Sequence, residues 1–330
     1  MRDFSYLRAT SVDEARRAAA LPAAMLLAGG TTLLDLAKCG VVEPARLIDI
    51  TRLSGLDAIQ VDAQGASIGA LAKMSRVADD PVIRAHFPAV SESLSQGASA
   101  QIRNMATIGG NLMQRTRCAY FRDPAVFSAC NKRAPGTGCS AIGGVTRNHA
   151  VLGLSEACIA TYPGDLAVAL VAFDAVVHLG DRQIAVDDFF LLPGMTPHRE
   201  HSLEPGEMIT AVTIPASPAV QRSTYLKVRD RQSYEFAAAS AAVGVELEPD
   251  GRTIRDLRVA LGGVATKPWR ARAVENALRG KALEAEAVRR ASLLAVEGAV
   301  DHGANRYKIE LAPRVVSRAI LKIAAAGEVR

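Results

Sequence analysis

The chain has 330 residues, 49% of them hydrophobic, which is enough to build two or three lobes around a sizeable core. Its net charge of +5 comes from basic residues scattered among acidic ones, and only 5% of residues are aromatic, so we expect no nucleic-acid binding. No apolar run reaches the ~20 residues that a membrane span needs, so we expect no membrane insertion.

The first 55 residues alternate between helical and strand patterns. Ser11 and Glu14 have the spacing of a capping box, which predicts a helix that begins at Ser11 and ends before Pro22. A buried strand is predicted over residues 24–28, a short helix over 32–38 and a further strand over 46–50. This alternation indicates a small α/β lobe.

A glycine turn joins the predicted strand to the short helix, in the stretch Met25-Leu26-Leu27-Ala28-Gly29-Gly30-Thr31-Thr32-Leu33. Two adjacent glycines allow backbone conformations closed to other residues, and their N–H groups can approach an anion closely. The threonine hydroxyls and the helix start add donors and a favourable field, so the turn is a candidate phosphate site. An ordinary strand-to-helix turn is the alternative, because the G-x-G-x-x-G pattern is absent.

A second glycine pair follows about eighty residues later, in Thr107-Ile108-Gly109-Gly110-Asn111. Between the two pairs, a strand is predicted over residues 66–71 and helices over 74–87 and 88–95. Two such loops could hold the two phosphates of a dinucleotide from different sides. The repetition therefore favours a phosphate site over a pair of ordinary turns.

The segment at residues 114–158, called the cysteine segment below, has few aliphatic and many basic residues over most of its length. Such a composition cannot bury enough apolar area to fold alone, so something else must hold it. Cys118, Cys130, Cys139 and Cys158 all lie in it, whereas Cys39 stands apart. Four thiolates can bind a [4Fe–4S] cluster or zinc, but the spacing is neither that of a bacterial ferredoxin nor that of paired zinc ligands. Buried thiols without a metal remain the third alternative.

After a return to strand and helix patterns over residues 149–214, a separate domain is predicted from residue 217 onward. Strand patterns cover residues 223–229, 235–246 and 253–261, and Pro249-Asp250-Gly251 predicts a hairpin turn. Helical patterns follow over residues 269–278, 284–300 and 311–326. The order of elements indicates an α+β domain.

The paired motifs Ala28-Gly29-Gly30-Thr31 and Ala106-Thr107-Ile108-Gly109-Gly110-Asn111 resemble the flavin signature of the FAD-binding medium subunits of molybdenum hydroxylases. The cysteine segment is most similar to that of bacterial periplasmic aldehyde oxidoreductases. The resemblance covers nearly the whole chain and implies an α+β protein with a two-lobed FAD-binding domain of the vanillyl-alcohol-oxidase/PCMH type over residues 1–216, with lobes of about 1–55 and 56–216. A domain of the CO dehydrogenase flavoprotein type, with a three-stranded antiparallel sheet plus helices, would then cover residues 217–330.

The resemblance also implies the cofactors. FAD would bind across the two glycine loops, and the four cysteines would hold a [4Fe–4S] cluster whose negative charge is offset by nearby basic residues, namely Arg115, Arg117, Lys132 and Arg133. Asp165, which the sequence by itself places at a helix N-cap, corresponds to an aspartate that contacts FAD. Lys227 corresponds to a lysine near the flavin, where a cation stabilises the reduced ring.

The function implied is that of an electron-transfer subunit. The chain has no residue set that could oxidise an aldehyde, so no catalytic residue is expected in it. The resemblance implies a heterotrimer in which a large subunit carries the molybdenum cofactor, a small subunit carries [2Fe–2S] clusters, and FAD in this chain passes electrons to an external acceptor. The alternatives are the flavin subunit of a xanthine dehydrogenase-like hydroxylase that reduces NAD⁺, and a non-redox binding module held together by zinc.

The location is expected to depend on a partner. The N-terminal residues lack the basic and apolar regions of a signal peptide, so we expect no export signal in the chain itself. The resemblance implies a periplasmic location reached by co-export with a partner subunit. Cytoplasmic residence is the alternative, since free cysteines suit a reducing compartment.

Overall fold

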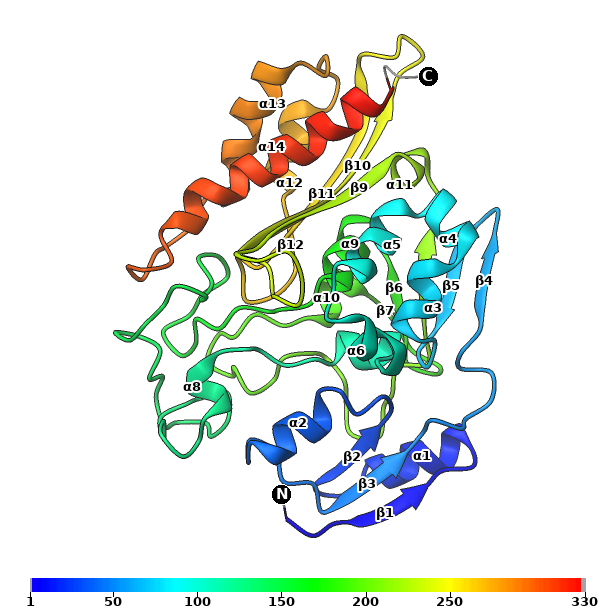
Figure 1. Cartoon of the computed structure of the whole chain (residues 1–330), viewed down its shortest axis with the longest axis vertical. Helices are drawn as coiled ribbons and strands as arrows, with labels where there is room; N and C mark the ends of the chain where they lie inside the picture. The colour runs from blue at the N-terminus through cyan, green and yellow to red at the C-terminus, as the bar shows by residue number, and fades with distance from the viewer. Residues whose placement is uncertain (1, 328–330) are drawn as a thin grey trace.

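A computed structural model describes residues 2–327 and arranges them around three β-sheets (Figure 1). Residues 328–330 of the predicted C-terminal domain lie outside the described residues. Each of the three sheets is accompanied by helices, so the predicted α+β class is confirmed. Within residues 2–327, no helix combines the length and the apolar character that crossing a membrane requires.

The first sheet has three parallel strands in the order β1-β3-β2 and forms the lower part of Figure 1. The Ser11 hydroxyl accepts a hydrogen bond from the Glu14 N–H at 3.1 Å, which confirms the predicted start of the first helix. The Glu14 carboxylate, however, binds Thr10 in place of the Ser11 N–H. The elements of this lobe are β1 (Ser5–Arg8), α1 (Val12–Ala19), β2 (Ala24–Leu27), α2 (Leu33–Lys38) and β3 (Arg46–Asp49).

The second sheet has five antiparallel strands in the order β4-β5-β8-β6-β7. The helix predicted over residues 74–87 is split at Asp80, because the Asp80 side chain accepts hydrogen bonds from Val82 and Ile83 and starts a new helix at Pro81. The strands are β4 (Ile59–Asp62), β5 (Gly65–Gly69), β6 (Val176–His178), β7 (Gln183–Ala185) and β8 (Ala211–Pro215). The helices are α3 (Met74–Asp79), α4 (Pro81–His86), α5 (Pro88–Ser95), α6 (Ala100–Met105), α7 (Ile108–Leu112), α9 (Leu166–Ala172) and α10 (Val186–Phe189).

The third sheet has the order β12-β11-β10-β9, so it contains four strands where three were predicted. The additional strand is Trp269–Arg270, which pairs with Ala260 and Leu261 and delays the start of the next helix. Helix α14 packs on one face of β10, while α5 and α9 contact the sheet from the other (Figure 1). The elements are α11 (Pro218–Gln221), β9 (Ser223–Val228), β10 (Ala239–Leu247), β11 (Ile254–Gly262), β12 (Trp269–Arg270), α12 (Arg272–Leu278), α13 (Ala285–Ser292), η1 (Leu293–Val296) and α14 (Tyr307–Gly327).

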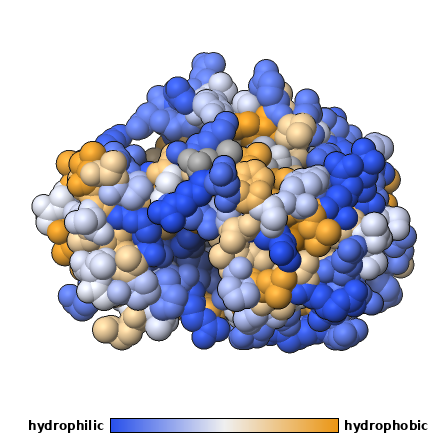
Figure 2. Space-filling view, turned by 90° about the horizontal axis from the view of Figure 1, so that it is seen from below, coloured by the Kyte–Doolittle hydropathy of each residue, from blue (hydrophilic) through white to orange (hydrophobic). Residues whose placement is uncertain are grey.

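The cysteine segment lies at the side of the molecule, between the first lobe and the C-terminal sheet (Figure 1). The α8 helix (Ala119–Arg122) is the regular element within it. Phe121 of α8 packs against Leu36 of α2, and Leu152 forms a parallel bridge with Ala265 beyond β11. The segment is therefore held by its neighbours, as its composition predicts. Seen from below, the molecule has a recess near the middle of a largely hydrophilic face (Figure 2).

Candidate functional site

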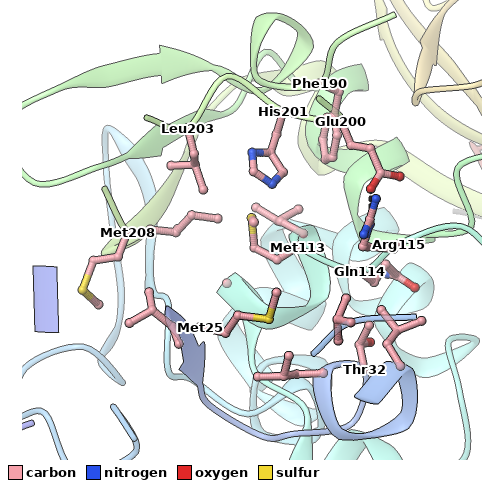
Figure 3. Close-up of a pocket in the computed structure, with 18 of the residues that line it drawn as sticks. Met25, Thr32, Met113, Gln114, Arg115, Phe190, Glu200, His201, Leu203 and Met208 are labelled. Carbon is pink, nitrogen blue, oxygen red and sulfur yellow. Dashed lines mark hydrogen bonds and ion pairs between the residues drawn. The ribbon is translucent and has the colours of Figure 1, made fainter. Parts of the chain in front are cut away.

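A cavity of about 570 Å³ lies where the first lobe, the second glycine loop and a long loop of the second lobe meet (Figure 3). Three stretches supply most of its walls, namely residues 24–33, 107–116 and 190–209. Most of the side chains that line it are hydrophobic, and its volume falls in the range of small-molecule and cofactor sites. We call it the flavin pocket below, after the cofactor that the sequence resemblance implies.

The first glycine turn forms the floor of this pocket. A Cβ atom on Gly29 would lie 2.2 Å from the Met105 carbonyl oxygen, and Gly30 has a φ of +71°, so both positions require glycine. The Thr32 side chain makes no capping hydrogen bond to α2 and points toward the pocket in Figure 3. Of the predicted stretch, the residues in the pocket wall are Met25, Leu26, Ala28, Gly29, Gly30, Thr31, Thr32 and Leu33, while Leu27 is not among them.

The second glycine loop faces the same pocket. The Thr107 hydroxyl accepts a hydrogen bond from the Gly110 N–H at 3.2 Å, and Gly109 donates to the Ala70 carbonyl at 2.8 Å. Thr107, Gly109 and Gly110 line the pocket, but Asn111 does not. The Asn111 amide nitrogen lies 3.3 Å from the sulfur of Met74. The fold thus brings the two predicted glycine loops to one cavity.

Asp165 and Lys227 bind each other outside the pocket walls. The Lys227 Nζ lies 2.8 Å from an Asp165 oxygen, and the Tyr225 hydroxyl donates to the other oxygen at 2.6 Å. Asp165 precedes α9 as predicted, but its side chain caps nothing in the described structure, because both oxygens are engaged. Burial raises the pKa of the Asp165 carboxyl, and the contact with Lys227 offsets part of that effect.

The loop at residues 190–209 supplies pocket residues that the motif search missed. Phe190, His201, Leu203 and Met208 surround the cavity in Figure 3, opposite the glycine turn. A stretch of this length without strand or helix is uncommon in a compact domain and is often functional. The absence of a helical or strand pattern in the sequence here could therefore have indicated a functional loop. Nothing in the local pattern, however, identifies the residues that turn inward.

Glu200 ties this loop to the cysteine segment. Its carboxylate pairs with the Arg115 guanidinium and lies 2.9 Å from the Lys132 Nζ, which also donates to the Pro197 carbonyl at 2.9 Å. Burial would raise the pKa of Glu200, but Lys132 and Arg115 together hold that pKa below its usual value. Two of the basic residues predicted to offset the negative charge of a cluster, Arg115 and Lys132, are therefore already paired with a carboxylate.

A second, smaller cavity is lined by all four cysteines of the cysteine segment, Cys118, Cys130, Cys139 and Cys158. Backbone bridges join Cys130 to Cys139 and Ser155 to Cys158, which closes the segment around the cavity. The guanidinium of Arg133 donates to the carbonyls of Tyr120 and Phe121 at 2.9 Å and so braces the same wall. Cys39 is an exposed free thiol away from this cavity.

Two of the thiols of this cavity, those of Cys118 and Cys158, are held in the protonated form by burial. Burial raises the pKa of Cys118 to about 12 and also raises that of Cys158. Among residues 2–327, no three His, Cys, Asp or Glu side chains are placed so that they could hold a single metal ion together. A metal group that binds here must therefore displace the protons of these thiols.

The two cavities share a wall. Lys132, Cys158 and Ala160 line both the flavin pocket and the cysteine cavity. Leu36 of α2 lines the flavin pocket and also packs in one cluster with Phe121 and Cys130. Groups bound in the two cavities would consequently be near neighbours.

The family is shown by comparison with known domains. Residues 2–217 match the FAD binding domain in molybdopterin dehydrogenase, and residues 224–323 match the CO dehydrogenase flavoprotein C-terminal domain. Among solved structures, quinoline 2-oxidoreductase from Pseudomonas putida 86 superposes with a TM-score of 0.74 and 25% identity over 98% of both chains. Carbon monoxide dehydrogenase from Hydrogenophaga pseudoflava superposes with a TM-score of 0.75 and 27% identity, also over 98% of both chains.

Curated relatives agree with this assignment. The chain is 48% identical over 285 residues to the aldehyde oxidoreductase FAD-binding subunit PaoB of Escherichia coli (strain K12), a match that covers 84% of this chain and 86% of that protein. It is 28% identical to the glyceraldehyde dehydrogenase medium chain of Sulfolobus acidocaldarius, over 87% of this chain and 85% of the relative. The chain therefore belongs to the FAD-binding medium subunits of the molybdenum hydroxylase family and is an oxidoreductase subunit.

Proposed function

We propose that this chain is the FAD and [4Fe–4S] subunit of a molybdenum-dependent aldehyde oxidoreductase. It would receive electrons from a [2Fe–2S] small subunit and deliver them through FAD to an external acceptor, while a large subunit with the molybdenum cofactor oxidises the aldehyde. The observation that carries the proposal is the wall, containing Cys158, that the flavin pocket shares with the four-cysteine cavity. Two adjacent redox sites are what an electron-transfer subunit requires.

The flavin pocket suits FAD because its glycine turns leave room at the backbone. A Cβ on Gly29 would strike the Met105 carbonyl, and one on Gly109 would lie 3.0 Å from the Ala70 side chain, so only glycine lets these two segments pack closely at the pocket wall. Thr31, Thr32 and Thr107 would supply polar contacts to the phosphates, and the hydrophobic walls would cover the apolar parts of the cofactor. Bound FAD supplies an acceptor and donor of electrons.

The cysteine cavity suits a [4Fe–4S] cluster better than zinc. Zinc binds four thiolates at about 2.3 Å each and so gathers the sulfurs around one point. In a [4Fe–4S] cluster each thiolate binds a different iron atom, and the ligands stand further apart. The four cysteines that line one cavity could each bind a different iron atom, and the resemblance of the cysteine segment to that of aldehyde oxidoreductases favours the cluster.

Metal and flavin analysis of the purified full-length chain tests the proposal. We expect FAD, together with about four iron atoms and about four inorganic sulfides per chain. Cys130→Ser should lose the iron, whereas Cys39→Ser should retain it, because Cys39 is exposed and lies away from the cavity. Zinc without iron would contradict the cluster and support a zinc-held module.

Activity assays of the assembled complex separate the two enzyme alternatives. Aldehyde oxidation with an artificial acceptor, and no aldehyde oxidation by this chain alone, is the expected result. Reduction of NAD⁺ by the complex would instead support the xanthine dehydrogenase-like alternative.

We also propose a periplasmic location reached with a partner subunit, which fractionation of cells with and without that partner would test.

A further inference from the structure

His149 is a buried histidine at the edge of the cysteine cavity, and neither the glycine loops nor the cysteine ligand set gives it a role. Only 5% of its surface is exposed, and its Nε2 lies 3.2 Å from the sulfur of Cys118. We propose that His149 is a positioning residue that donates a hydrogen bond from Nε2 to the Cys118 sulfur and thereby raises the reduction potential of the cluster. This inference rests on the cluster in the proposed function.

The direction of this hydrogen bond follows from the state of the sulfur. A cysteine that binds iron is a thiolate and has no proton to donate, so a contact at 3.2 Å requires the proton on the His149 Nε2. The other ring nitrogen, Nδ1, is buried and has no hydrogen-bond partner within residues 2–327. An unpartnered N–H would cost more there than an unpartnered lone pair, which also favours the proton on Nε2.

The backbone on both sides of His149 is fixed by the C-terminal part of the chain. The Thr146 hydroxyl donates to the His302 carbonyl at 2.7 Å, and the Asn305 amide donates to the Ala150 carbonyl at 2.8 Å. Val151 donates to the Val264 carbonyl at 2.8 Å. The imidazole is thus held against Cys118 by contacts that are independent of the cysteine ligands themselves.

The cationic side chains of Arg133 and Lys132, which lie near the cavity, are directed elsewhere. Arg133 donates to backbone carbonyls, and Lys132 is bound to Glu200 and to the Pro197 carbonyl. Among the side-chain nitrogens described in residues 2–327, the one that reaches a cavity sulfur belongs to His149, while the Ala160 backbone N–H donates to the Cys158 sulfur at 3.5 Å. Hydrogen bonds to ligand sulfurs stabilise the additional negative charge of a reduced cluster and so raise its potential.

Redox titration of the full-length chain, monitored by electron paramagnetic resonance, tests the inference. Iron and sulfide analysis of the wild-type chain comes first, because a chain without a cluster refutes the proposed function and not the role of His149. His149→Leu should keep its iron and show a more negative midpoint potential. His149→Gln places an amide N–H near the position of Nε2, so its potential should return toward that of the wild type. His178→Gln, in the distant β6 strand, is the control and should titrate as the wild type.

An unchanged potential in His149→Leu with full iron content overturns the inference. If His149→Leu loses its iron, its potential cannot be measured, and the wild-type chain labelled with ¹⁵N-histidine is used for the test. A histidine nitrogen that couples to the reduced cluster in pulsed electron paramagnetic resonance then supports the hydrogen bond, and a spectrum unchanged by the label refutes it.

Discussion

The cysteine segment and the C-terminal sheet show two different ways of ordering a chain. Strands β10 and β11 have nine residues each, and residues 239–245 of β10 are all buried, since helices cover both faces of the sheet. The cysteine segment contains one helix of four residues, and its aliphatic side chains at Val126 and Val145 face solvent. Its interior combines the four thiols and the carbonyls bound by Arg133 with a few apolar side chains, such as those of Phe121 and Val151.

The two regions are therefore stabilised by different interactions. Buried aliphatic side chains make the C-terminal sheet stable through the hydrophobic effect, which needs no ligand. The cysteine segment has few aliphatic residues for that, so its order depends on contacts with its neighbours and, under the proposed function, on a bound metal group as well. Removal of the metal should therefore destabilise the cysteine segment, whereas truncation of a core side chain should destabilise the C-terminal sheet.

Removal of iron should have the largest effect and should be confined to the cysteine segment. Stripping the metal with a chelator under reducing conditions should speed amide exchange in residues 114–158 on the order of 10³-fold, equivalent to about 4 kcal/mol of local stability. Strands β10 and β11 should keep their protection, because their core contains no thiol. Hydrogen exchange with mass spectrometry measures both regions in one sample, and equal loss of protection in both would contradict the comparison.

Leu257→Ala should produce the converse result. Leu257 is fully buried in the core between β11 and the C-terminal helices, so truncation should lower the free energy of unfolding by about 2–5 kcal/mol. Iron content should not change, since the side chain is remote from the cysteine cavity. Denaturant titration and iron analysis check the two expectations, and Leu293→Ala, at an exposed position, is the matched control.

Glu200→Gln should have a smaller effect at the junction between the two cavities. The variant leaves Arg115 and Lys132 without their carboxylate in a partly buried site, which should cost about 2 kcal/mol and weaken FAD retention. Because the folded pKa of Glu200 is lowered, its stabilisation is present above the unfolded value near pH 4.3 and is lost as the pH falls below it. The variant should lack that part of the acid dependence in thermal melts. Glu204→Gln, whose side chain is largely exposed and pairs with Arg199, should retain it.

Local patterns predicted much of both sites. The two glycine pairs, the helix start at Ser11 and the hairpin at Pro249-Asp250-Gly251 are matters of backbone conformation, which a few neighbouring residues decide. The composition of the cysteine segment likewise indicated that it would need support. Patterns failed where a distant contact intervened, as at Trp269, which pairs with Leu261 in a strand although the local pattern predicted a helix there.

The sequence by itself determined where the chain turns, which stretches are apolar and which residues can bind phosphate or metal, because these properties belong to single residues and their near neighbours. Only the tertiary structure decided that Glu200 joins Arg115 and Lys132, that His149 meets Cys118, and that Cys158 stands between two cavities. Each of these contacts joins residues from separate parts of the chain. Such a meeting depends on how whole elements pack, which no local pattern encodes.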